Sequence, residues 1–242
     1  FLPQEQKQIS DLAKETGVTK KTIVNNIAQL HENNPMLGHR GCRLGISYPE
    51  ITKMQATSIL NASAKLIKEG ISVVPEIMIP LVGSINEFNN QREIIINCAH
   101  KIENKNKLKI NYKIGTMIEL PRACFIADKI AKEADFLSFG TNDLTQTTFG
   151  FSRDDVSGVI KDYIKKGIIE ADPFQSLDTE GVGKLIEIAV NKARTVNPKI
   201  KIGVCGEHGG DPQSINFFKK CGFDYVSCSP FRVPVAILYT AK

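Results

Sequence analysis

The period of the hydrophobic and polar positions changes along the chain, and these changes predict its elements. Between residues 49 and 69 the apolar side chains recur every three or four positions, which is typical of an amphipathic helix. Residues 73–82 are almost continuously apolar, as in parallel strands that are buried on both faces. We predict further strands at 114–120, 136–139, 200–205 and 225–228. We predict further helices at 85–102, 122–133, 156–166, 179–196, 212–221 and 234–240.

This alternation of strands and helices predicts an α/β fold with a parallel sheet and right-handed crossovers. A sixth strand is expected near residues 37–46. A closed (β/α)8 barrel needs eight strands, so either the sheet is open or strands are missing. The chain begins Phe-Leu-Pro-Gln rather than with Met, so we expect a fragment or a processed form. We therefore predict a TIM-type (β/α)8 barrel that is truncated on its N-terminal side.

The first part of the chain predicts two helices over residues 4–31, broken at Gly17. Residues 11–27 are similar to a DNA-binding helix-turn-helix, but the motif is short enough to arise by chance. The alternative is a helical hairpin packed on the next domain, which we favour because little else supports DNA contact. We predict a helical segment at 1–33 and the barrel domain at 34–242.

Composition narrows the class of protein. The chain has 242 residues, of which 42% are hydrophobic and 24% charged, as in soluble globular proteins. No apolar run approaches the roughly 20 residues that span a bilayer, and no signal peptide is visible. The net charge is +5, and the basic residues are dispersed along the chain. Their densest cluster, 101–109, predicts a solvated helix end rather than a nucleic-acid contact. The mild excess of positive charge favours an anionic substrate. The six cysteines form no CxxC pair, which indicates reduced thiols and a cytoplasmic protein.

Two carboxylates are candidates for metal binding. Glu119 and Asp143 each follow an apolar strand, where a charge is costly unless it is paired or bound to a metal. Each residue alone is more simply explained as a cap of the following helix. Two such residues at the ends of neighbouring strands favour a Mg²⁺ site, because hard cations take oxygen ligands.

Two further groups are candidates for anion binding. Gly140, Thr141 and Asn142 precede Asp143, and their backbone N–H groups and the amide side chain suit a carboxylate or phosphate. The same composition is typical of a tight turn, and the pattern leaves both readings open. Arg40 is a candidate anion clamp, with Arg43 as the alternative and surface ion pairs as the simpler explanation for both.

Cys205 is the candidate proton donor. It ends a predicted strand in a glycine-rich, sterically open loop, with Glu207 and His208 close enough in sequence to tune it. The alternative, a small buried hydrophobic residue, suits the other cysteines better. His208 is a second-ranked acid or base. Cys205 and His208 have the spacing of two metal ligands, but no second pair completes a zinc site.

Taken together, five segments resemble the C-terminal phosphoenolpyruvate/pyruvate-binding domain of the pyruvate, phosphate dikinase family, one of the PEP-utilising enzymes. The resemblance covers almost the whole chain from residue 34, in the family's order. Phosphoenolpyruvate synthase and Enzyme I of the sugar phosphotransferase system share the barrel, but the long forms of the last two segments are closer to the dikinase. The segments are NPMLGHRGCRLGISYPEI (34–51), PEIMIPLVG (75–83), GTMIELPRA (115–123), FGTNDLTQTTFGFSRDD (139–155) and CGEHGGDP (205–212).

The resemblance implies a transferase of the kinase type in pyruvate metabolism. In the full enzyme, ATP, pyruvate and phosphate give AMP, phosphoenolpyruvate and diphosphate, and a phosphohistidine on a swivelling domain carries the phosphoryl group. By motif, Glu119 and Asp143 would bind Mg²⁺ at the substrate, Arg40 would bind its phosphoryl or enolate oxygen, and Cys205 would exchange the methyl proton. The substrate carboxylate would be held by Gly140, Thr141, Asn142 and Asp143.

The family also implies partners: pyruvate or phosphoenolpyruvate, the phosphohistidine domain of the same protein, and a second copy in a homodimer through the barrel, with no nucleic acid and no membrane. The nucleotide and phosphohistidine domains and the first barrel strands are not in this chain. We expect that it cannot run the overall reaction alone. The alternatives are a barrel of the phosphoenolpyruvate synthase type, or a non-catalytic dimerisation or binding fragment.

Overall fold

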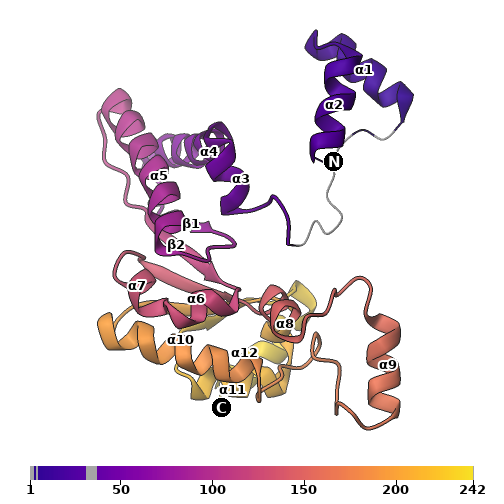
Figure 1. Ribbon diagram of the computed structural model, residues 1–242. Coiled ribbons are helices and arrows are strands. Elements are labelled where there is room, and N and C mark those ends of the chain that lie inside the picture. Colours follow the sequence, from indigo (N-terminus) through magenta and orange to yellow (C-terminus); the bar gives the residue numbers. More distant parts are fainter. Residues whose placement is uncertain (1–2, 4, 31–36, 242) are drawn as a thin grey trace. The chain divides into compact units, whose positions relative to one another are not determined.

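The structure, a computed structural model, describes residues 3, 5–30 and 37–241 (Figure 1). The chain divides into two compact units, Phe1–His39 and Arg40–Lys242, which we call the N-terminal and C-terminal units.

The N-terminal unit is a pair of helices, α1 (Gln6–Thr16) and α2 (Lys20–Leu30). Helix α1 ends at Gly17, whose φ of 71° lies in the left-handed region that glycine adopts without strain. Ile9 and Ile23 are buried. The predicted pair of helices broken at Gly17 is therefore confirmed, while the choice between a packing hairpin and a DNA-binding motif stays a prediction.

The C-terminal unit is built on a parallel sheet in which the strands lie side by side in chain order. Every residue of β3 is buried, as expected of a largely apolar strand in the middle of a parallel sheet. Gly140 pairs with Cys205, so the carboxyl ends of β3 and β4 are adjacent. The predicted strands are confirmed, although the first and last are shorter than their apolar runs. The strands are β1 (Glu76–Ile79), β2 (Lys113–Ile118), β3 (Phe136–Gly140), β4 (Lys201–Cys205) and β5 (Tyr225–Val226).

Helices connect these strands and cover the sheet (Figure 1). Helix α4 packs against α5, and α10 packs against α6 and α7, so that a single apolar core runs through the sheet and these helices. The helices are α3 (Cys42–Ser47), α4 (Pro49–Lys68), α5 (Ile85–Asn106), α6 (Pro121–Phe125), α7 (Ala127–Ala131), α8 (Thr141–Phe149), α9 (Ser157–Lys165), α10 (Val182–Val196), η1 (Glu207–Gly210), α11 (Pro212–Lys220), η2 (Pro230–Arg232) and α12 (Val233–Ala241).

Three local predictions are corrected. The sixth strand expected near 37–46 is wrong: Gly41 has a φ of 58°, the Cys42 N–H bonds to the carbonyl of Pro80, and α3 begins at Cys42. A strand needs a neighbouring strand to accept its hydrogen bonds, whereas α3 packs against the helices α4 and α5. The helix expected at 122–133 is two short helices, α6 and α7. Helix α8, directly after β3, was not predicted.

The fold class is an α/β fold with a parallel sheet, as predicted. The part of the chain that the structure describes contains five strands, with β1 and β5 at the sheet edges, and they form an open sheet. The closed eight-stranded barrel therefore stays a prediction. Among the described residues, no helix is both long enough and apolar enough to cross a bilayer.

Candidate active site

An acidic pair lies where β2 and β3 end. Glu119 follows β2 directly, and Asp143 lies in the first turn of α8, which begins where β3 ends. Glu119 is only 2% exposed, and the backbone N–H of Leu81 donates to its Oε1 at 2.6 Å. The Asp143 carboxylate is within hydrogen-bonding reach of Glu119. Two carboxylates from neighbouring strand ends are thus brought together, as the sequence predicted.

Burial and the second carboxylate change the ionisation of this pair. Burial raises the pKa of Glu119 to about 7, the Leu81 N–H opposes that rise, and the charge of Asp143 adds to it. Two carboxylates at close range repel one another unless a cation lies beside them. The protein itself supplies one: Arg40 Nη2 lies 3.5 Å from Asp143 Oδ2.

Arg40 and Gln146 fix the Asp143 carboxylate. The Arg40 side chain is 45% exposed, so its guanidinium faces both Asp143 and solvent. Gln146 Nε2 donates to Asp143 Oδ1 at 2.9 Å. Arg40 therefore stands beside the acidic pair, as expected of an anion clamp. Arg43, the alternative clamp, lies in the first turns of α3.

The segment from Gly140 to Asp143 joins the end of β3 to the first turn of α8. The first N–H groups of a helix have no acceptor within the helix, and they favour negative charge. Gly140 must lack a side chain, because a Cβ there would lie 2.7 Å from Glu119 Oε2. The close approach of strand end and carboxylate therefore requires glycine. Of the two readings left open for this segment, the tight turn is wrong, because a helix begins at Thr141, and the anion site stays a prediction.

Cys205 ends β4 beside Gly140. Its Sγ accepts a hydrogen bond from Ser138 Oγ at 3.5 Å and donates to the carbonyl of Phe139 at 3.6 Å. Burial raises the pKa of this thiol, and the charges of Glu119 and Asp143 raise it further, against the Ser138 hydrogen bond. The thiol is therefore protonated at neutral pH, which suits a proton donor better than a nucleophile.

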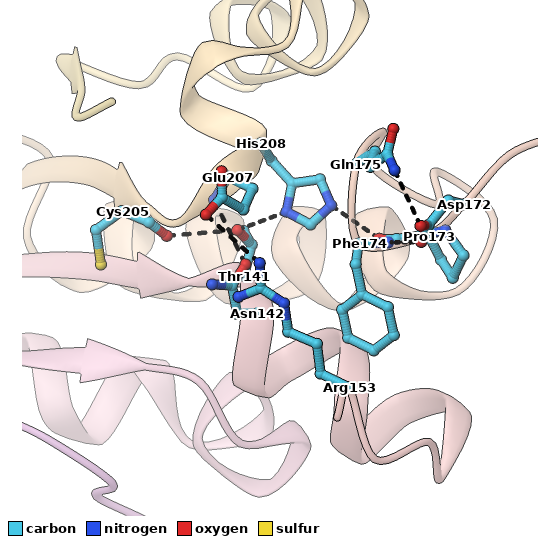
Figure 2. A network of polar contacts seen from close by, with 10 residues as sticks. All are labelled: Thr141, Asn142, Arg153, Asp172, Pro173, Phe174, Gln175, Cys205, Glu207 and His208. Carbon is cyan, nitrogen blue, oxygen red and sulfur yellow. Dashed lines mark hydrogen bonds and ion pairs between the residues drawn. The ribbon is translucent and has the colours of Figure 1, made fainter. Parts of the chain in front are cut away.

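His208 lies between Thr141, the first residue of α8, and Pro173, with one ring nitrogen toward each (Figure 2). It is fully buried, with Nδ1 2.7 Å from Thr141 Oγ1 and Nε2 2.8 Å from the carbonyl oxygen of Pro173. Both ring nitrogens are thus engaged inside the protein. That arrangement argues against the second-ranked role of His208 as a general acid or base.

Sequence reasoning missed three residues that shape the site: Leu81, Ser138 and Gln146. A polar residue inside an otherwise apolar strand was an available signal for Ser138. Leu81 acts through its backbone, with a φ of 58°, and no side-chain pattern indicates that. Gln146 follows Asp143 by three positions, and this spacing becomes informative only once α8 is known to be a helix.

The fold and the site define a class of protein: an α/β domain with a carboxylate pair, an arginine and a thiol at the carboxyl ends of parallel strands. The sequence matches the family described as "PEP-utilising enzyme, PEP-binding domain" over residues 6–242, and the chain belongs to this family.

Similar curated proteins are named as pyruvate, phosphate dikinases. The chain is 54% identical over its whole length to pyruvate, phosphate dikinase 1, chloroplastic, of Arabidopsis thaliana, and covers 25% of that protein. It is 51% identical over its whole length to pyruvate, phosphate dikinase of Clostridium symbiosum, and covers 28% of it. The chain thus spans about a quarter of the length of these relatives. Their names agree with the family resemblance that the sequence motifs indicated. Because some relatives are named as chloroplastic, a cytoplasmic location stays a prediction.

Among solved structures, a citrate lyase from Burkholderia xenovorans aligns with a TM-score of 0.46 and 11% identity, over 68% of this chain and 48% of that one. This similarity is too low to bear on the fold or the function.

Proposed function

We propose that this chain is the phosphoenolpyruvate/pyruvate-binding part of a pyruvate, phosphate dikinase. The observation that carries the proposal is the acidic pair at adjacent strand ends, where Glu119 is buried, Asp143 is half-buried and Arg40 lies beside Asp143. The whole-length identity to named dikinases supports the same assignment. In the full protein the overall reaction would be ATP + pyruvate + phosphate = AMP + phosphoenolpyruvate + diphosphate.

The acidic pair fits Mg²⁺. The atoms that the pair offers to a metal are carboxylate oxygens. Among the described residues, no three or more His, Cys, Asp or Glu side chains are grouped so that they could hold a metal, so the protein offers two carboxylates here. Mg²⁺ is usually held by one or two carboxylates, with substrate oxygens and waters completing its shell, so two are enough. Glu119 and Asp143 would hold the ion. When bound, Mg²⁺ supplies a positive charge that stabilises negative oxygen on the substrate.

The remaining residues would bind and orient the substrate. Arg40 would neutralise the enolate or phosphoryl oxygen, because a guanidinium pairs with such oxygens through parallel N–H groups. The amino end of α8, with Thr141 and Asn142, would receive the substrate carboxylate. In-line phosphoryl transfer then depends mainly on positioning and on charge neutralisation.

Cys205 would move the methyl proton. Toward pyruvate, the S–H bond breaks and a C–H bond forms at the methylene carbon of the enolate, leaving a thiolate. Toward phosphoenolpyruvate, the thiolate takes a methyl proton from pyruvate, and the enolate oxygen then accepts the phosphoryl group. The Ser138 hydroxyl holds Sγ in place and stabilises the thiolate in either direction.

The chain would work within a larger assembly. A phosphohistidine domain of the same protein would deliver the phosphoryl group to the rim where β2, β3 and β4 end. Strands outside the chain would close the open sheet into a (β/α)8 barrel, and two barrels would form a homodimer. These partners follow from the family, and the chain alone is expected to lack the overall activity.

The test uses the full-length parent protein with pyruvate, ATP and phosphate. Formation of phosphoenolpyruvate, AMP and diphosphate is expected, with diphosphate formation dependent on added phosphate. Formation of phosphoenolpyruvate and AMP with no diphosphate would instead identify the phosphoenolpyruvate synthase type, in which water is the second acceptor. Absence of pyruvate-dependent turnover would contradict both enzymatic assignments and favour the alternative of a non-catalytic binding module. Formation of phosphoenolpyruvate by the 242-residue chain alone would contradict the fragment interpretation.

A further inference from the structure

We propose that His208 is a positioning residue that fixes the Thr141 hydroxyl and, through it, the first turn of α8. The inference rests on the proposed function and assigns His208 a task within that site. His208 Nδ1 lies 2.7 Å from Thr141 Oγ1, and Nε2 lies 2.8 Å from the Pro173 carbonyl oxygen (Figure 2). Neither contact reaches the substrate position, so the ring acts through Thr141.

The direction of the two hydrogen bonds follows from their partners. The Pro173 carbonyl can only accept, so Nε2 carries the hydrogen. Burial lowers the pKa of His208, which keeps the ring neutral and leaves Nδ1 as an acceptor. Thr141 must then donate its single hydroxyl hydrogen to Nδ1, in preference to the Cys205 carbonyl oxygen at 3.4 Å. The hydroxyl therefore has one defined orientation.

This contact joins the two loops that carry the chemistry. Glu207 N–H donates to Asn142 Oδ1 at 3.4 Å, so the loop after β4 also holds the second residue of α8. The two loops are in close contact at Gly206, whose φ is 119°, and a Cβ there would lie 2.8 Å from Thr141 Oγ1. His208 makes the shortest of these polar contacts. It thereby sets how the loop after Cys205 sits on the turn that bears Asp143.

The same ring reaches a third segment. Pro173 lies in the connection between α9 and α10, and the adjacent Phe174 belongs to a small apolar cluster with Val156 and Ile160. Asp172 Oδ1 accepts from the Phe174 N–H at 2.9 Å and fixes the turn around Pro173. His208 therefore transmits the position of this long connection to the first turn of α8.

Two substitutions at His208 separate its two contacts. In His208→Asn the amide lies near the former Nδ1 and can still accept from Thr141. In His208→Gln the amide lies near the former Nε2, so the bond to Pro173 can persist while the bond to Thr141 is lost. His100, an exposed histidine on α5, gives the matched control His100→Gln.

The experiment measures both partial reactions of the full-length parent: pyruvate-side transfer, and ATP- and phosphate-dependent phosphorylation of its own histidine. We expect His208→Gln to lower kcat/KM for pyruvate by about ten- to a hundredfold, mostly through a raised KM, because the turn that holds the carboxylate loses its orientation. His208→Asn should lose less than about tenfold, since it keeps the acceptor. The ATP-side rate and the His100→Gln control should stay at wild-type values.

A second pair of variants keeps the proposal testable if His208 variants fold poorly. Thr141→Val removes the hydroxyl at nearly constant volume, and it should raise KM for pyruvate as His208→Gln does. The double variant Thr141→Val with His208→Gln should lose no more kcat/KM for pyruvate than either single variant, because both substitutions remove the same hydrogen bond. Equal losses in His208→Asn and His208→Gln, additive losses in the double variant, or loss of the ATP-side rate would overturn the positioning role. A wild-type parent without pyruvate-side turnover would instead refute the proposed function.

Discussion

Two buried glutamates in this chain have opposite surroundings. Glu103, near the end of α5, is 7% exposed; its Oε1 accepts from the Ile110 N–H at 2.9 Å and its Oε2 lies 3.1 Å from Lys109 Nζ. These partners, the Ile110 N–H first, hold its pKa below the usual value. Glu119 is also buried, but beside a second carboxylate, and its pKa is raised to about 7.

The difference separates a carboxylate that the protein itself neutralises from one whose surroundings favour an added cation. Glu103 is satisfied by groups of the protein, so its charge stabilises the fold where α5 ends. Glu119 has one strong internal donor, the Leu81 N–H, and a like charge nearby, so its environment favours an added cation.

The largest effect is expected from Glu119→Gln in the full-length parent. Loss of one metal oxygen and of its charge should lower pyruvate-side turnover by more than about a hundredfold. Glu103→Gln is the matched control: it should leave turnover unchanged and lower the free energy of unfolding by about 1–3 kcal/mol, because a buried hydrogen-bonded charge is lost. Steady-state kinetics and urea denaturation measure the two quantities. Equal losses of activity in both variants would remove the contrast.

Cys205→Ala should slow proton exchange at the methyl group of pyruvate by about a hundredfold or more, the usual contribution of a positioned acid or base. Cys221, also a half-buried free thiol but beyond the end of α11, supplies the control Cys221→Ala. Exchange of deuterium from solvent into pyruvate, followed by NMR, gives the rate. A wild-type rate in Cys205→Ala would show that another group moves the proton.

Gly140→Ala tests how closely Glu119 is packed. The new Cβ would lie 2.7 Å from Glu119 Oε2 and 2.8 Å from Glu119 Cβ, so the carboxylate must move. We expect a loss of about 1–3 kcal/mol in the free energy of unfolding, together with weaker Mg²⁺ binding. Gly158→Ala, in α9, meets nothing within 4 Å and should stabilise by about 0.4–1 kcal/mol. Destabilisation of the same size in both would mean that the contact with Glu119 is not what matters.

The smallest effect concerns pH. Burial holds the pKa of His208 below its usual 6.5, so the unfolded chain takes up this proton first as the pH falls. The stabilising contribution of neutral His208 is complete above pH 6.5 and is lost toward its lower folded-state pKa, at no more than about 1.4 kcal/mol per pH unit. His208→Gln should remove this part of the slope, and His100→Gln should keep it. Denaturation series between pH 7 and pH 5 measure it; parallel curves for wild type and His208→Gln would contradict the buried neutral ring.

The sheet could be predicted from the sequence because its strands are long apolar runs. Helix α8 was missed because Gly140–Asp143 has turn composition, and only packing against the loop after β4 selects the helix. The strand expected at 37–46 is wrong for a related reason, since the segment turns at Gly41 and enters α3 at Cys42 instead of pairing with a neighbouring strand.

The sequence was sufficient to predict the acidic and thiol side chains of the candidate site, but not the residues that hold them in position. Glu119, Asp143 and Cys205 stand out because polar groups end apolar strands. The contacts of His208 could not be predicted, since its spacing from Cys205 carries no information about the Pro173 carbonyl, which comes from a distant segment. Leu81 contributes a backbone N–H, and a sequence pattern does not reveal which N–H group will face a carboxylate.

The central claim is that Glu119 and Asp143 together hold a divalent cation with the substrate. The most direct measurement is calorimetric titration of the full-length parent with oxalate, a dianion shaped like the pyruvate enolate, in the presence and absence of Mg²⁺. We expect Mg²⁺-dependent heat from wild type and from Glu103→Gln, and none from Glu119→Gln or Asp143→Asn. Unchanged heat in both of the latter variants would contradict the claim.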